Sequence, residues 1–193
     1  MSRDAAQILV QPGFLIWAPT DLSAASPHSG TELGYTEDGI RLQHNQETRP
    51  IRTEETGVAT QEIIYLGEDW RLTVVFLQWD NEIIPKLFPN STAGGTSGDQ
   101  LIQYPASTAY PGYKMSGQAA ILAYSPTDLT NNKAVVFRKA IPLAAQEISF
   151  GSSQDSVLAC SFQALPDESI GSGDGRYATR TVAIGDRRDI SLT

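Results

Sequence analysis

The side chains most able to do chemistry are few in this chain, and they are widely spaced. Its two histidines are His28, in a loop rich in Pro and Ser, and His44, in a long polar segment. The single cysteine, Cys160, lies in the apolar run SVLACSFQAL, where we expect a small buried side chain and not a nucleophile. One cysteine and two histidines cannot supply a Cys/His zinc site, so no metal centre is predicted.

Two further patterns match functional motifs only in part. The segment GSGDG at residues 171–175 has the composition of a phosphate loop, but no Lys-Ser/Thr follows it, so a flexible turn is expected. Glu62, Glu68 and Asp69 are close enough in sequence to resemble paired acids, whereas a solvated strand face explains them more simply. No serine has the Gly-x-Ser-x-Gly context of a nucleophile elbow. We therefore predict that the protein is not an enzyme, holds no cofactor and acts through its surfaces.

Composition narrows the class of partner. The chain has 193 residues, which suits one domain of ordinary size, and its 16 Gly and 11 Pro favour strands and loops over helices. Fourteen basic against 22 acidic residues give a net charge of −8, without the positive surface that grips nucleic acid. The N-terminal residues lack the apolar segment of a signal peptide, and no run approaches the roughly 20 apolar residues of a membrane span. These features predict a protein without membrane contact that is cytoplasmic at synthesis.

The hydrophobic pattern predicts a mainly β fold. Residues 59–67 and 69–79 indicate two strands separated by Gly67 and Glu68, and the second alternates between an apolar and a polar face. The apolar face is expected to hold Trp70, Leu72, Val74 and Phe76, and the polar face Asp69, Arg71 and Thr73. Further strands are predicted in residues 5–18, 117–126, 133–142, 156–166 and 180–185.

A change of period predicts one short helix at about residues 80–88. Ile83 and Leu87 are four residues apart, which is helical spacing, and Asp80 or Asn81 can cap the N-terminus. Pro85 must then lie in the first turn, because further along its ring would clash with preceding carbonyl groups. Residues 90–116 are rich in Gly, Ser, Thr and Pro and are predicted to be a long loop.

A charged, strand-like segment precedes these elements and is predicted to form an extended arm at about residues 37–60. Asp38-Gly39 is a turn signal, and the IRLQHN that follows it alternates but has only a narrow apolar face. Pro50 cannot donate to a strand ladder, so it belongs to an edge strand or a projecting arm. A solvated hairpin that protects a sheet edge from aggregation is the alternative explanation.

The order LGYTEDGI, then RLQHNQETRPIRTEETG, then QEIIYLGEDWRLTVVFLQWDNEIIPKLFP, within residues 33–89, resembles the major tail tube proteins of long-tailed bacteriophages. In that family a Gly-x-Thr-x-Asp-Gly-like turn leads into a strand and a long extended loop, followed by a Glu-containing strand pair and a short helix. The likeness covers under a third of the chain. It implies a tail tube domain over residues 1–165, whereas residues 166–193 form a polar extension that does not map onto the family.

The resemblance implies a β-sandwich or barrel-like subunit with one flanking helix, six of which form a ring. Rings stack into a tube through which DNA passes without specific binding, so the partners are the chain itself and tail proteins such as the tape measure and the terminator. The location implied is the virion, after assembly in the host cytoplasm. The residues implied in contacts between rings are Glu47, Arg49, Pro50, Arg52, Glu54 and Glu55. The candidates for lining the channel are Glu62, Asp69, Arg71, Thr73, Ser161 and Gln163.

Two other functions remain open from the sequence. The first is a tail terminator or distal tail protein of related fold, which would form one ring without polymerising. The second is a carbohydrate-binding β-sandwich module, because Trp17, Trp70 and Trp79 are aromatic side chains of the kind that stack on sugars. Trp70 and Trp79 lie in apolar strand contexts, which favours a place in the core.

Overall fold

The computed structural model describes residues 13–22, 30–34, 36–52, 54, 57–77, 83–88, 92–94, 101–103, 119–124, 133–149, 157–166, 182–186 and 190. The elements in these ranges are mostly strands, with one helix, α1 (Ile84–Leu87). The strands are β1 (Phe14–Trp17), β2 (Thr31–Glu32), β3 (Thr36–Ile51), β4 (Glu62–Phe76), β5 (Thr92–Gly94), β6 (Leu101–Gln103), β7 (Ala119–Tyr124), β8 (Lys133–Ser149), β9 (Val157–Ala164) and β10 (Val182–Asp186).

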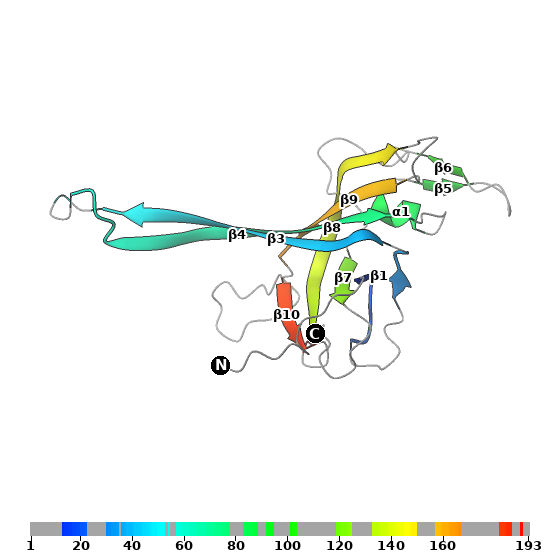
Figure 1. The fold of residues 1–193 in the computed structure, drawn as a ribbon, viewed down its shortest axis with the longest axis horizontal. Coiled ribbons are helices and arrows are strands. Elements are labelled where there is room, and N and C mark those ends of the chain that lie inside the picture. Colours follow the sequence, from blue (N-terminus) through cyan, green and yellow to red (C-terminus); the bar gives the residue numbers. More distant parts are fainter. Residues whose placement is uncertain are drawn as a thin grey trace.

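Eight of the strands form one open antiparallel sheet, which confirms the predicted mainly β fold. Its order is β2-β1-β7-β8-β9-β4-β3, and β10 pairs with β8 outside this path, while β5 and β6 form a separate two-stranded sheet. One border is the two-residue β2 and the other is the 16-residue β3. Figure 1 shows β3 and β4 running far beyond the rest of the sheet as a paired ribbon.

The sheet is curved, so that side chains from strands that are not neighbours in its order come into contact. β1 and β9 are separated by β7 and β8, so a flat sheet would hold them about 14 Å apart at ~4.8 Å per strand. The rings of Trp17 on β1 and Phe162 on β9 nevertheless lie 6.1 Å apart between centroids. β8 carries the bend, because Ala140 and the residues before it pair with β7, and Ala140 and the residues after it pair with β9. This curvature gives the predicted sandwich-like body, in which one face of the sheet encloses the core.

The main core fills the inside of this curve. Leu72, Val74 and Phe76 on β4 are buried and Trp70 is half-buried against the same core, while Arg71 and Thr73 are exposed, which confirms the predicted apolar and polar faces. Leu87 of α1 is fully buried and lies in the same cluster. At about 1.5–3 kcal/mol for each fully buried large apolar side chain, this cluster is the main source of stability.

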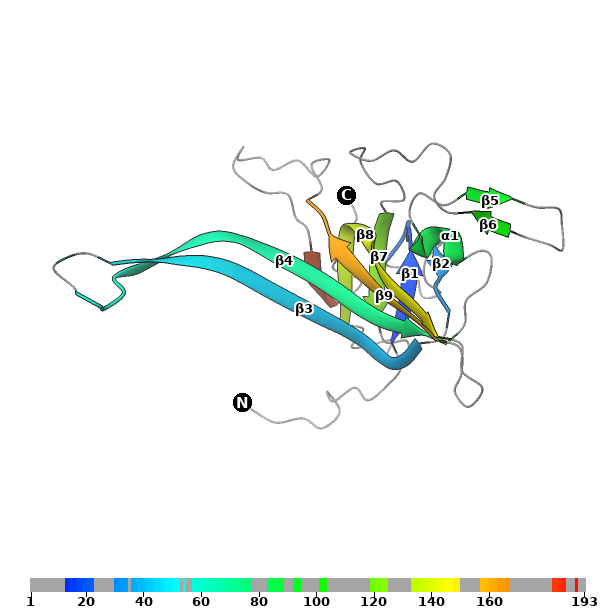
Figure 2. The same ribbon diagram turned by 90° about the horizontal axis from the view of Figure 1, so that it is seen from above.

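The outside of the curve is covered over one part of the sheet and open over another. A second cluster, formed by Ile16, Leu22, Leu122, Ala134 and Val136, covers the outer face of β1, β7 and β8. The outer face of β4 and β9 instead carries mainly polar side chains that are exposed or half-buried, together with the half-buried pair Val75 and Ala159. Among the described residues, this polar face next to the ribbon is left open, and Figure 2 shows β4 and β9 side by side from above.

The helix differs from its prediction in length and in its cap. It is a single turn that begins after Ile83, which has no side-chain cap hydrogen bond, and Pro85 lies in its first two positions. A helix beginning at Asp80 would have put Pro85 past the first turn, where its ring clashes with a carbonyl group, so the predicted start was wrong. Asp80 and Asn81, the predicted caps, lie outside the described residues.

Two predicted breaks, at Asp38-Gly39 and at Gly67, were also wrong. At each place the structure has a bulge within a continuous strand instead of a turn between two elements. Asp38 and Gly39 form no turn between elements; they are an irregularity within β3, where the register moves from Glu37–Val75 to Ile40–Val74. Gly39 has a φ of 75°, which a residue with a side chain rarely adopts. The two runs expected on either side of Gly67 are the single strand β4, because β3 pairs along its whole length and a second bulge lies at Gly67.

The remaining predictions concern the second half of the chain. The predicted strands in residues 117–126, 133–142, 156–166 and 180–185 are confirmed as β7, β8, β9 and β10, although β8 continues to Ser149. The predicted loop at residues 90–116 contains the β5–β6 pair, whose three-residue strands are too short to have a recognisable period. β10, from the C-terminal segment, pairs with β8, and Val182 packs against the main core.

Candidate functional site

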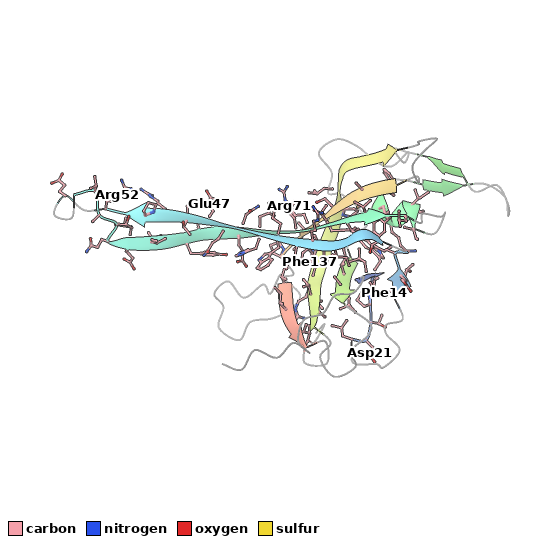
Figure 3. The ribbon with its side chains drawn as sticks, in the orientation of Figure 1. Phe14, Asp21, Glu47, Arg52, Arg71 and Phe137 are labelled. Carbon is pink, nitrogen blue, oxygen red and sulfur yellow. The ribbon has the colours of Figure 1, made fainter. Side chains whose placement is uncertain are left out.

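The β3–β4 ribbon is the most unusual surface feature of the molecule, and we call the part beyond the body the arm (residues 44–70). β9 pairs with β4 from Arg71 to Phe76, so from Trp70 to Glu62 β3 is the only one of the described strands that pairs with β4. At about 3.4 Å per residue this stretch extends roughly 27 Å past the body. Figure 3 shows Arg52 near the tip of the arm, Glu47 about midway along it and Arg71 at its root.

The predicted contact residues between rings lie on the outer part of this arm. Glu47, Arg49 and Pro50 are exposed on β3, Arg52 is exposed just after it, and Glu54 is exposed near the tip. Glu55 lies outside the described residues. Pro50 sits opposite Ile63 in an edge strand, where its missing N–H leaves no gap in a central ladder, as the sequence predicted.

Pairing along the arm defines two faces. Directly opposed residues in an antiparallel pair lie on the same side of the sheet. His44–Trp70, Thr48–Tyr65 and Pro50–Ile63 continue the side that faces the core in the body, and we call this the core-side face. Asn45–Asp69, Arg49–Ile64 and Ile51–Glu62 lie on the other side, which we call the opposite face. Leu66 is the extra residue at the Gly67 bulge, and it reverses the alternation of β4 beyond that point.

Four consecutive apolar residues on β4 form the part of the arm that sequence reasoning did not assign to a site. The exposed fractions of Ile63, Ile64, Tyr65 and Leu66 are 63%, 44%, 53% and 54%. Desolvation, and then the nearby Glu68 carboxylate, raise the pKa of the Tyr65 phenol above its ordinary value. The signal was present in the sequence, because a run of apolar residues in a strand indicates burial on both faces.

A hollow on the outer arm combines positive charge with apolar surface. Its volume is about 680 Å³, and it is lined by Arg49, Pro50, Ile51, Arg52 and Ile64. Two guanidinium groups beside three apolar side chains suit a segment that carries a carboxylate next to an apolar residue. The hollow lies on a surface that is open to another molecule.

Aromatic stacking holds the root of the arm. The ring of His44 lies on the ring of Trp70, with centroids 4.0 Å apart and planes 19° from parallel. His44 Nε2 is also 3.1 Å from Glu68 Oε2. These contacts join β3 to β4 on the core-side face at the point where the arm leaves the body.

The predicted channel residues fall into one group with one exception. Asp69 accepts hydrogen bonds from Arg71 Nε at 2.8 Å and from Gln163 Nε2 at 3.0 Å. Thr73 lies opposite Ser161 in the β4–β9 ladder, beside this cluster. These five residues therefore share the outer face of β4 and β9, which the described residues leave open, and Arg71 pairs with Asp69 on its own strand.

Glu62 is the exception. Although it lies on the same side of β4 as Asp69 because of the bulge, it is near the far end of the arm, about 24 Å from Asp69 along the strand at 3.4 Å per residue. The structure does not bring it to the other five.

The described residues offer little to reaction chemistry. They hold no group of three or more His, Cys, Asp or Glu side chains that could bind a metal ion. Cys160 is 1% exposed and lies in the core, as predicted. Across the same residues, no helix is both long and apolar enough to span a membrane. No protein-family model matches the chain, and no curated protein matches it.

Proposed function

We propose that the chain is a self-assembling structural subunit of the kind that builds the tail tube of a long-tailed phage. The observation that carries the proposal is the arm, which extends roughly 27 Å beyond the body and exposes large apolar side chains. A lone two-stranded ribbon is only marginally stable in water. The arm therefore needs a surface to lie on, and copies of the same chain supply it.

The shape of the molecule favours contacts that repeat. The arm and any surface that receives it are different parts of the chain, so the contact is head-to-tail, and such contacts generate rings or filaments. The long border strand β3 and the short border strand β2 leave the sheet open. Joining the sheets of neighbouring copies would remove these borders, which otherwise invite aggregation.

We assign the channel lining to the uncovered outer face of β4 and β9. Its residues are Asp69, Arg71, Thr73, Ser161 and Gln163, and the charge of Arg71 is balanced by Asp69 at 2.8 Å. A surface of small polar groups and paired charge makes few of the phosphate contacts that release counterions and hold DNA in place. DNA would then slide through the tube. The tape measure and terminator are further partners, and the virion is the site of action.

The carbohydrate-binding alternative has less support from the tryptophans. Trp17 is 7% exposed in the core, and the ring of Trp70 is stacked against His44 while packing on the core. Neither presents an open ring face for a sugar. Trp79 lies outside the described residues.

Electron microscopy of the purified protein, with and without its arm, tests the proposal. In the shortened variant, residues 48–66 are replaced by Asn-Gly, a turn that suits a hairpin closed after the Glu47–Gly67 pair. We expect hollow tubes of stacked rings from the intact chain, and rings or monomers from the shortened chain with unchanged β-sheet circular dichroism.

Other outcomes would redirect or end the proposal. Isolated rings from the intact chain would favour a terminator or distal tail protein. Undiminished tubes from the shortened chain would contradict the role of the arm. An intact chain that remains monomeric at high concentration would contradict self-assembly altogether.

A further inference from the structure

We propose that the outer arm is inserted between two surfaces, each belonging to another copy of this chain, and is covered on both faces. This inference rests on the proposed function and deepens it, because it states how the arm is held. The starting observation is the run Ile63–Ile64–Tyr65–Leu66 on β4, in which every side chain is at least 44% exposed.

The register distributes this run over both faces of the arm. Ile63 and Tyr65 lie on the core-side face, and Ile64 lies on the opposite face beside Arg49. A ribbon that lies on a single surface needs apolar residues on one side only. Along its strands, apolar residues then alternate with polar residues that face water. An arm that is apolar on both sides is the pattern of a strand pair buried on both sides.

The size of the arm supports the same conclusion. A ribbon roughly 27 Å long and about 10 Å wide offers on the order of 300 Å² on each face, from the rise per residue and the strand spacing. Stable interfaces cover about 800 Å² on each partner. One face of the arm is too small to hold copies together, whereas two faces with the tip come closer to this area.

Charge at the hollow on the outer arm favours another copy of the chain as its occupant. Arg49 on the opposite face and Arg52 just beyond β3 line this hollow of about 680 Å³ together with Pro50, Ile51 and Ile64. The chain as a whole carries a net charge of −8, so a second copy offers an excess of carboxylates for these two guanidinium groups. The core-side face, with Ile63 and Tyr65, has no arginine at its paired positions and suits an apolar surface, and Pro50 lies between this face and the hollow.

Cysteine labelling of each face tests the two-sided insertion. Ile63→Cys and Ile64→Cys place a reactive thiol on the core-side and the opposite face of the arm, at adjacent positions. Each variant is mixed with excess wild-type chain, and its reaction with a water-soluble maleimide is followed before and after assembly. The native Cys160, which is 1% exposed, provides the slow internal reference.

We expect both thiols to react about tenfold more slowly, or slower still, in assemblies than in free chains, because reaction then requires local opening. If assemblies form but one thiol keeps its free rate, the arm lies on a single surface and this inference is wrong, while the proposed function stands. If the wild-type chain forms no assemblies, the proposed function fails, and this inference fails with it.

Discussion

The two ends of the β3–β4 pair use the same strands in different ways. In the body, Leu72, Val74 and Phe76 alternate with exposed residues, and each is at most 1% exposed. In the arm, the consecutive residues Ile63 and Ile64 are both exposed. The apolar side chains at the body end are therefore buried within one chain, whereas those at the arm end remain exposed. The stability of the single chain therefore resides in the body, while the exposed apolar surface of the arm is available to partners.

The largest effect expected from this contrast is on the stability of the single chain. Leu72→Ala should lower the free energy of unfolding by about 3 kcal/mol, because it removes buried methyl groups and leaves a cavity. Ile64→Ala, on the same strand, should change it by no more than about 0.5 kcal/mol, because no core surrounds that side chain in the monomer. Urea denaturation under dilute, monomeric conditions measures both. Similar losses for the two variants would erase the distinction between body and arm.

The next effect concerns backbone protection. Amide hydrogens of the arm should exchange rapidly in free chains, since a two-stranded ribbon opens easily, while those of β4 beside β9 should exchange slowly. On assembly we expect the arm amides alone to gain strong protection. Hydrogen exchange followed by mass spectrometry of peptides from both ends of β4 makes the comparison. Slow exchange of the arm in the monomer would show that the ribbon is stable without a partner.

A smaller effect separates the two bulges. Gly39 lies near the body and has a φ of 75°, so Gly39→Ala should destabilise the chain by about 1 kcal/mol. Gly67 lies on the arm, and a Cβ added there meets nothing within 4 Å, so Gly67→Ala should be neutral within about 0.5 kcal/mol. Thermal unfolding of the two variants side by side measures the difference. A larger loss from Gly67→Ala would mean that the arm contributes to monomer stability.

The smallest effect is expected on the polar face. Asp69→Asn removes the charge that Arg71 contacts but retains one oxygen for a hydrogen bond, and Arg71 is 44% exposed. We expect a loss of about 0.5 kcal/mol, which added salt should reduce. Urea denaturation at low and high ionic strength measures it. A loss that salt leaves unchanged would indicate that packing, and not charge, holds Asp69 in place.

The body could be predicted from the sequence because its strands alternate regularly. The period of two along residues 70–76 gave the buried face of β4 correctly, and Pro50 marked an edge position. The bulges were not predictable in this way, because Asp38-Gly39 and Gly67 also fit turns, and only pairing with the other strand decides between the two. The start of α1 was not predictable from the capping residues, because Pro85 lies in the first two helical positions and so requires a start at Ile84.

The candidate site was predictable in part for the same reason. Asp69, Arg71 and Thr73 share a face by simple alternation, and Ser161 and Gln163 join them through the β4–β9 register. On a regular strand, strict alternation from Asp69 would place Glu62 on the other face. The extra residue Leu66 returns Glu62 to the face of Asp69, so alternation alone does not predict its side. The apolar run at residues 63–66 is visible in the sequence. It is exposed because, among the described residues, β9 pairs with β4 only from Arg71 to Phe76, and no local sequence pattern predicts where that pairing stops.

Sedimentation velocity of the purified wild-type chain, as a function of concentration, measures whether the chain assembles through its arm. We predict that the 20.9 kDa chain is replaced by very large assemblies as concentration rises, and that the variant lacking residues 48–66 does not follow it. A wild-type chain that sediments as a monomer at every concentration, with its arm left uncovered, would contradict the account.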